Sequence, residues 1–271
     1  MKRKFSIKKT LKVLLLFISI FLFIFSLLHI IDYINNSNKT KKQIKEIKED
    51  VEIKETDENT EIIESEEKEE NPYWDFIKLN LKDVDLKKLK EQNKDTIGWI
   101  EVKGTNVNYP FVQTSDNEYY LTHSFNKKNN SAGWIFLDYR NSIKSLEKNT
   151  IIYGHGRYDN TMFGTLKNMF NKTWLNNKQN YVINISTESY DTMWQIFSLY
   201  KIKTTTDYLS VDFTDKEFNS FIKMITERSD YNFNTNVSST DKILTLSTCY
   251  NNEIKIVVHA KLIKLRKKDV N

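Results

Sequence analysis

The single cysteine of the chain, Cys249, ends an apolar run that begins at Ile243 and reads ILTLSTC. β-Branched residues in such a short apolar run predict a strand, so the cysteine stands at the end of a rigid element with a loop directly after it. Most free cysteines are small buried hydrophobes. A thiolate is nevertheless the most reactive nucleophile among side chains. Cys249 is therefore a candidate nucleophile, with a buried structural role as the alternative.

A cysteine nucleophile requires an acid–base partner, and histidine suits that role near neutral pH. His155 follows the apolar run TIIY (residues 150–153) and lies between Gly154 and Gly156. Because flanking glycines permit a sharp turn and leave the ring accessible, we predict His155 as the partner. The other three histidines lie in an apolar N-terminal segment, in a polar stretch and within a predicted strand: His29, His123 and His259. The last of these is the second candidate.

Acyl transfer also requires a donor to the oxyanion of the tetrahedral intermediate. Lys255 lies six residues after Cys249, at the start of the next apolar run, and a short loop would bring the two strand ends together. Arg140 and Arg157 are the other basic candidates.

Three residues are candidates for substrate binding. Strand alternation predicts Ser247 on the same face as Cys249 and Thr248 on the opposite face. Ser247 fits either a substrate contact or an interior hydroxyl. Arg157 follows His155 by two residues and is the third candidate.

Several other kinds of site do not match the sequence. Zinc takes three or four closely spaced Cys or His ligands, which one cysteine and scattered histidines do not supply. The segment GHG at 154–156 lacks the lysine and the spacing of a phosphate-binding loop. The chain has no basic stripe with interleaved aromatic residues. We therefore predict no metal, no cofactor and no nucleic-acid partner.

The elements that position these residues are mostly strands. Eight short runs rich in β-branched and aromatic residues follow Pro72, at residues 98–102, 108–112, 134–139, 150–153, 181–185, 193–202, 243–248 and 255–265. Eight strands in one domain favour a closed or nearly closed barrel. Helices are predicted at residues 84–92, 161–170 and 214–228, the last with a capping box formed by Thr214 and Glu217.

The N-terminus has the features of a membrane anchor. Six basic residues and no acid precede residues 13–31, which are apolar except for two serines and a histidine. This length is just enough to span a bilayer, and the basic flank predicts a cytoplasmic N-terminus with the remainder outside. A cleavable signal peptide is the alternative, but no small-residue cleavage site follows. With one cysteine, no intramolecular disulfide can form.

These features divide the chain into three parts. Residues 1–36 form the basic tail and membrane anchor, and residues 72–271 form one domain with a sizeable core. Residues 37–71 carry 13 acidic and 7 basic side chains and no aromatic residue. Such a segment buries too little apolar surface to order itself, so we predict a charged linker, although an exposed helix within it is compatible with this composition.

Four segments, taken together, resemble class B members of the sortase family, and the resemblance covers nearly all of residues 72–271. The strongest, LTLSTC, is similar to the family's TLxTC segment. In chain order they are NEYYL at 117–121 leading to GWIFLDYRN at 133–141, YGH at 153–155 followed by Met162, Phe163 and Leu166, LTLSTC at 244–249, and IVVHAK at 256–261.

The resemblance implies an eight-stranded sortase barrel with peripheral helices and a cysteine transpeptidase on the outside of a Gram-positive cell. Cys249 corresponds to the nucleophile and His155 to the acid–base residue. The implied partners are a secreted protein with an NPxTx-like C-terminal sorting signal, an amine of a lipid II-type peptidoglycan precursor, and the cell membrane.

One position departs from the family pattern, which has an arginine where this chain has Lys255. Lysine is a compact point charge, whereas arginine offers a planar fork of donors. This departure has three interpretations. Lys255 replaces the arginine less effectively, or a nearby arginine such as Arg157 takes its role, or the chain is weakly active or has a narrower role. We favour the first interpretation. The alternative functions are a cysteine peptidase with water as acceptor and a non-enzymatic surface-binding module.

Overall fold

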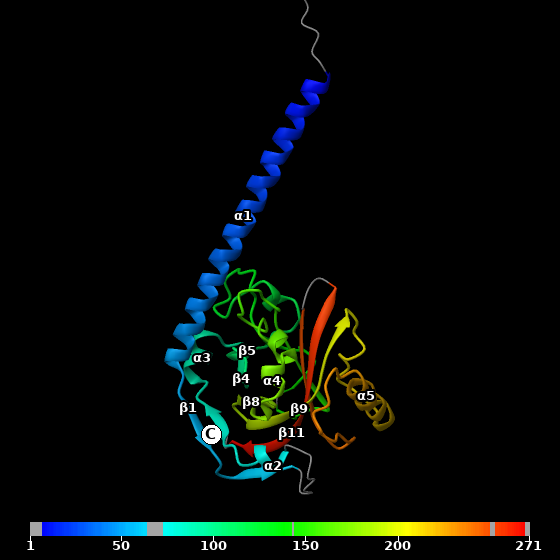
Figure 1. The fold of residues 1–271 in the computed structure, drawn as a ribbon. Coiled ribbons are helices and arrows are strands. Elements are labelled where there is room, and N and C mark those ends of the chain that lie inside the picture. Colours follow the sequence, from blue (N-terminus) through cyan, green and yellow to red (C-terminus); the bar gives the residue numbers. More distant parts are fainter. Residues whose placement is uncertain (1–6, 64–72, 143, 250–252, 269–271) are drawn as a thin grey trace, which may run out of the picture.

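The computed structural model describes residues 7–63, 73–142, 144–249 and 253–268, and Figure 1 shows a barrel beside one long helix. Eight strands form a closed ring in which each is hydrogen-bonded to the next. In ring order they are β10 (Ile243–Cys249), β7 (Asn149–Tyr153), β6 (Phe136–Leu137), β5 (Asn108–Val112), β4 (Thr96–Val102), β8 (Val182–Thr187), β9 (Tyr190–Lys203) and β11 (Ile254–Lys267).

Antiparallel pairing between β10 and β11 closes the ring, and the β10–β7 and β5–β6 pairs are parallel. The predicted eight-stranded barrel is therefore confirmed. Each predicted run corresponds to one strand of the ring, but only two residues of the run at 134–139 are paired as β6. After Leu137 the Asp138 N–H still donates to the Ile151 carbonyl at 2.9 Å, and the Asp138 side chain binds Asn117 and Arg140.

Alternation along the strands produces two cores. One face of each strand points into the barrel, where buried aromatic and aliphatic side chains form the main cluster. A second cluster lies between the outer face of β9, β10 and β11 and the helix α5 (Asp215–Glu227). Helix α5 buries one amphipathic face there, and its predicted capping box is present: the Thr214 hydroxyl accepts from the Glu217 N–H at 3.3 Å, and the Glu217 carboxylate accepts from the Thr214 N–H at 2.8 Å.

The remaining helices are short: α2 (Tyr73–Phe76), α3 (Lys87–Gln92), η1 (Tyr119–Leu121), η2 (Leu166–Phe170), α4 (Lys172–Leu175) and η3 (Lys178–Asn180). The prediction of a helix over residues 161–170 was wrong for its first half. Met162 has a left-handed backbone with φ of 49° and pairs with Gly156 in an isolated bridge. A side-chain-bearing residue in that conformation cannot continue a right-handed helix. At residues 84–92, Val84 instead ends β3 (Leu81–Val84) and the helix begins at Lys87.

Helix α1 (Ile7–Asp50) contains the apolar segment and runs on to the barrel (Figure 1). Helix α1 is long and apolar enough to cross a membrane, although signal sequences and buried core helices meet the same two criteria. The apolar part of α1 is not buried in the protein.

The segment predicted as an unordered linker is ordered over residues 37–63. It contains the end of α1, then β1 (Ile53–Thr56), which pairs with β3, and β2 (Thr60–Ile62), which extends the sheet beside β11. Composition alone missed this because a few residues of the helix make specific contacts: Asn36, Ser37 and Thr40 are buried against the barrel, and Ile47 is buried in the main core. Residues 64–71 lie outside the described residues, and the three-part division of the chain stays a prediction.

Candidate active site

The strand ends that carry the candidate nucleophile and base are neighbours. Strands β7 and β10 run parallel, with Tyr153 level with Ser247, and the Gly154 N–H donates to the Ser247 carbonyl at 3.3 Å. Two residues beyond this pair, Cys249 is the last residue of β10 and His155 follows the end of β7. Because parallel strands end at the same edge of a sheet, both residues lie at one end of the barrel. The Cys249 side chain is outside the described part of the structure.

Lys255 lies at the same end of the barrel. It is the direct cross-strand partner of Cys249 in the β10–β11 ladder, and on its other side it is level with Ile202 of β9. Opposed residues of antiparallel strands have Cα atoms about 4.5–5.5 Å apart. The structure therefore brings together the backbones of all three predicted catalytic residues.

The His155 ring is oriented by a backbone carbonyl. His155 Nε2 lies 2.7 Å from the Leu121 oxygen, which can only accept, so Nε2 carries the proton. In the neutral ring the basic nitrogen is then Nδ1. Gly133, with φ of 59°, lies against the ring: a Cβ there would be 2.4 Å from the Tyr120 oxygen and 3.0 Å from His155 Cδ2. Glycine is thus required at this position.

Gly154 has a different role from the one predicted. Its backbone is not left-handed, and a Cβ on it would lie 2.9 Å from the ring of Phe163. It is glycine because Phe163 packs directly over the chain just before His155, not because the backbone needs to turn sharply there.

Arg157 is held in a buried ion pair. Its guanidinium donates to both carboxylate oxygens of Asp159, and both side chains are only 6% exposed. Burial by itself would raise the pKa of Asp159, but hydrogen bonds from Arg157, Thr161 and Ser37 hold that pKa well below its usual range. The guanidinium also lies 4.5 Å from the centre of the Tyr33 ring. A substrate contact through Arg157 would have to compete with these partners.

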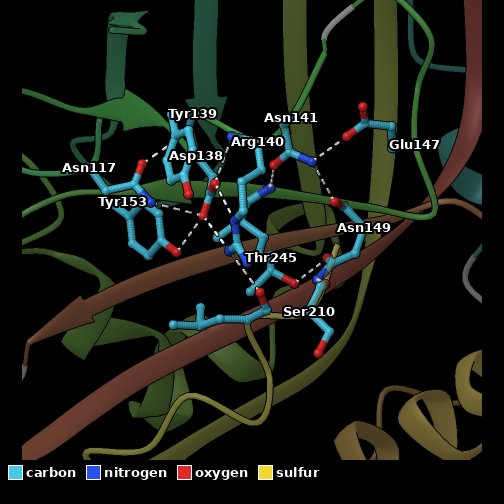
Figure 2. A network of polar contacts seen from close by, with 12 residues as sticks. Asn117, Asp138, Tyr139, Arg140, Asn141, Glu147, Asn149, Tyr153, Ser210 and Thr245 are labelled. Atoms are coloured by element: carbon cyan, nitrogen blue, oxygen red, sulfur yellow. Dashed lines mark hydrogen bonds and ion pairs between the residues drawn. The ribbon is translucent and has the colours of Figure 1, made fainter. Parts of the chain in front are cut away.

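Arg140 is also held in an ion pair with a carboxylate, that of Asp138, in the network that Figure 2 shows. It forms two hydrogen bonds, 2.9 and 2.7 Å long, to the fully buried Asp138, which also accepts from the Tyr153 hydroxyl at 2.9 Å. It donates in addition to the Leu209 carbonyl at 2.9 Å. Asp138 thereby connects the segment after β6 to Tyr153, which ends β7 two residues before His155.

The two hydroxyl residues before Cys249 lie on opposite faces of β10. Ser247 is buried on the outer face, where its hydroxyl lies 3.0 Å from the hydroxyl of Tyr208. Thr248 is buried on the other face, and its hydroxyl has no hydrogen-bond partner among the described residues. Their proposed contacts with substrate stay predictions.

His259 has no exposed surface and both ring nitrogens are in hydrogen bonds, to the Thr245 hydroxyl at 2.9 Å and to the Tyr200 hydroxyl at 3.0 Å. Burial, together with the positive charge of Arg228, lowers its pKa to about 3. It therefore stays neutral near physiological pH, which leaves His155 as the better acid–base candidate.

The buried His259 predicts acid sensitivity. As pH falls below about 6.5, the unfolded chain binds a proton at this residue, whereas the folded chain does not until near pH 3. The free energy of unfolding should therefore fall by about 2 kcal/mol between pH 7 and pH 5 from this residue alone. Urea unfolding at the two pH values should show a smaller loss for His259→Gln than for the wild type, with His123→Gln as control. Equal losses in the wild type and His259→Gln, or an NMR titration of the His259 ring near pH 6.5, would refute the prediction.

Several contributors were missed from the sequence. Asp159 and Asp138, each two residues from an arginine, organise the segments around His155, and Leu121 contributes only a backbone oxygen. The D-x-R and R-x-D spacings are visible in the sequence, but a carbonyl partner leaves no signal in residue type. Among the described residues, no group of three or more His, Cys, Asp or Glu side chains could hold a metal ion.

Residues 100–263 match the family model of the sortase domain. Sortase B of Staphylococcus aureus is 38% identical over 182 residues, 65% of this chain and 74% of the relative. A crystal structure of sortase B from B. anthracis superposes with a TM-score of 0.67 at 32% identity, covering 87% of this chain and 99% of that one. The Staphylococcus aureus sortase B–substrate complex gives a TM-score of 0.62 at 37% identity, covering 66% and 84%.

These matches define the class of protein: a closed β-barrel that works as a cysteine transpeptidase. The chain belongs to the sortase family, and within that family to class B.

Proposed function

We propose that this chain is a membrane-anchored transpeptidase that cleaves a C-terminal, NPxTx-like sorting signal of a secreted protein and joins the new carboxyl end to an amine of a lipid-linked peptidoglycan precursor. The observation that carries the proposal is the parallel register of β7 and β10: Cys249 is the last residue of β10, and His155 lies two residues beyond the end of β7 at the same edge. The solved Staphylococcus aureus sortase B–substrate complex, to which this chain is similar, supports the binding of a substrate by this fold.

In the proposed reaction the Cys249 thiol gives its proton to His155, and the resulting thiolate attacks the carbonyl carbon of the signal's threonine, forming a C–S bond. The Lys255 ammonium stabilises the oxyanion that develops on the carbonyl oxygen. The C–N bond of the scissile peptide then breaks, and His155 gives a proton to the leaving amine. The acceptor amine attacks the thioester, His155 takes a proton from it, and the thiolate leaves as the new amide forms.

A panel of sorting-signal peptides, assayed with and without triglycine, tests this function. We expect an acyl adduct on Cys249 by mass spectrometry and a ligated product only when the amine is present. Hydrolysis that triglycine does not divert would support the peptidase alternative. Absence of both adduct and product with every peptide would support a binding module instead.

The proposed topology predicts that the catalytic domain is reached from outside the cell, because the basic N-terminus remains inside. Cys249 is the only cysteine, so labelling reports on one site. A membrane-impermeant maleimide should label the full-length chain on intact cells, and Cys249→Ala should remove the signal. Labelling that appears only after lysis would contradict the orientation.

A further inference from the structure

Just beyond its apolar segment, α1 presents a polar face to the barrel. Tyr33, Asn36, Ser37 and Thr40 recur at spacings of three and four residues, which places them on one side of the helix. The last three are 7%, 5% and 0% exposed, whereas Asn35 and Asn38 beside them are exposed. The helix therefore meets the barrel through a specific polar face, called here the α1 polar face.

One half of this face contacts the segment that follows His155. The Tyr33 hydroxyl accepts the Asp159 N–H at 3.2 Å, and Ser37 donates a hydrogen bond to the Asp159 carboxylate. That carboxylate also accepts from the N–H and the hydroxyl of Thr161, at 3.0 and 2.6 Å. The same segment is hydrogen-bonded to His155 itself, because the His155 carbonyl accepts the N–H of Arg157 at 3.1 Å.

The other half contacts residues 130 and 131, in the segment that lies against the His155 ring. Asn36 Nδ2 donates to the Ser131 hydroxyl at 3.1 Å, and Asn130 Nδ2 donates to the Thr40 hydroxyl at 3.0 Å. The backbone of Asn130 in turn accepts the Gly133 N–H at 2.9 Å. This segment supplies both the Leu121 carbonyl that binds His155 Nε2 and the Gly133 backbone that lies against the ring.

From these contacts we propose that the α1 polar face positions His155. Residues 119–133 contact the imidazole through Leu121 and Gly133, whereas residues 156–161 directly follow His155 in the chain and hydrogen-bond to its carbonyl. Helix α1 is hydrogen-bonded to both segments. Tyr33, Asn36 and Thr40 are positioning residues in this sense: they touch neither the ring nor a reacting atom, and act through Asp159, Ser131 and Asn130. The effect on rate rests on the proposed acid–base role of His155, whereas the effect on the ring does not.

The test uses the full-length chain in detergent micelles or nanodiscs. Asn36→Leu combined with Thr40→Val removes the contacts to one segment, and Tyr33→Phe removes a single hydroxyl from the other. Asn38→Leu is the matched control, since it changes an exposed amide on the same helix. The Nε2 proton of His155, assigned by its loss in His155→Gln, is followed by NMR, and kcat and KM for the peptide are measured in parallel.

We expect the two polar-face variants to shift the His155 Nε2 resonance and speed its exchange with solvent. Their kcat should fall about 10- to 100-fold, the scale on which a small misplacement of a catalytic group acts, while KM stays near the wild-type value. Asn38→Leu should leave all of these unchanged. A resonance, exchange rate and kcat equal to the control in Tyr33→Phe and in the double variant would overturn the proposal. A shifted resonance in a chain that never forms an acyl adduct would support positioning and refute the proposed function.

Discussion

Replacing Cys249 with alanine should abolish the acyl adduct and lower turnover of a sorting-signal peptide about 10⁴-fold or more, the scale on which loss of a covalent nucleophile acts. The proposed reaction passes through a thioester, and this chain has no second thiol to form one. Stopped assays with mass spectrometry of the intact protein would measure both effects.

The fold should survive this substitution. Cys249 is the last residue of β10, and the rest of that strand keeps its pairing with β7 through residues 243–247 and with β11 through residues 243–248. A thermal melt by circular dichroism therefore provides the control for folding, and reaction of the wild-type thiol with a maleimide shows that it is accessible. Turnover in Cys249→Ala at the wild-type rate would refute the nucleophile assignment.

The barrel was predictable because its strands have a strong local signal. Runs such as TIIY before Gly154 and ILTLSTC are too short and too rich in β-branched residues to favour helices. Eight of them in one domain leave few architectures that pair every edge. The adjacency of Cys249 and His155, by contrast, came from the family resemblance, since strand order in a barrel does not follow from residue type.

The order of the segment after α1's apolar run could not be predicted from composition. Charge density and the absence of aromatic residues indicate a segment that gains little from burial, yet Ile47 of this segment is buried in the main core. Besides Ile47, a set of hydrogen bonds to partners about 90 to 130 residues away along the chain holds α1 to the barrel. The spacing of Tyr33, Asn36 and Thr40 is visible in the sequence, but the same pattern fits an exposed helix face equally well.

The loop after His155 was mispredicted because a carboxylate overrides local helix propensity. Asp159 gathers Arg157 and the backbone and hydroxyl of Thr161, and the chain then passes through the left-handed Met162. Strain of this kind is found where the surrounding structure fixes the backbone, often at functional sites. Its place directly after the proposed acid–base residue agrees with that pattern.

Substituting Lys255 tests the one departure from the family pattern. If its ammonium stabilises the oxyanion, Lys255→Ala should lower kcat/KM for acylation by about two to three decades, the usual effect of losing one such donor. Lys255→Arg should keep wild-type activity or raise it, because the guanidinium offers more donors in a planar fork. Lys203→Ala is the matched control, since Lys203 is exposed on the neighbouring strand, level with Ile254.

The structure also bears on the alternative in which an arginine takes this role. Arg157 and Arg140 each form two or more hydrogen bonds to a buried carboxylate, Asp159 and Asp138, and neither lies on β11. Removing a partner from such a pair leaves an uncompensated buried charge, so Arg157→Ala or Arg140→Ala should lower the melting temperature as well as the rate. Lys255→Ala should lower the rate alone. An unchanged rate in Lys255→Ala, with a rate loss and an unaltered melting temperature in one arginine variant, would transfer the oxyanion role to that arginine.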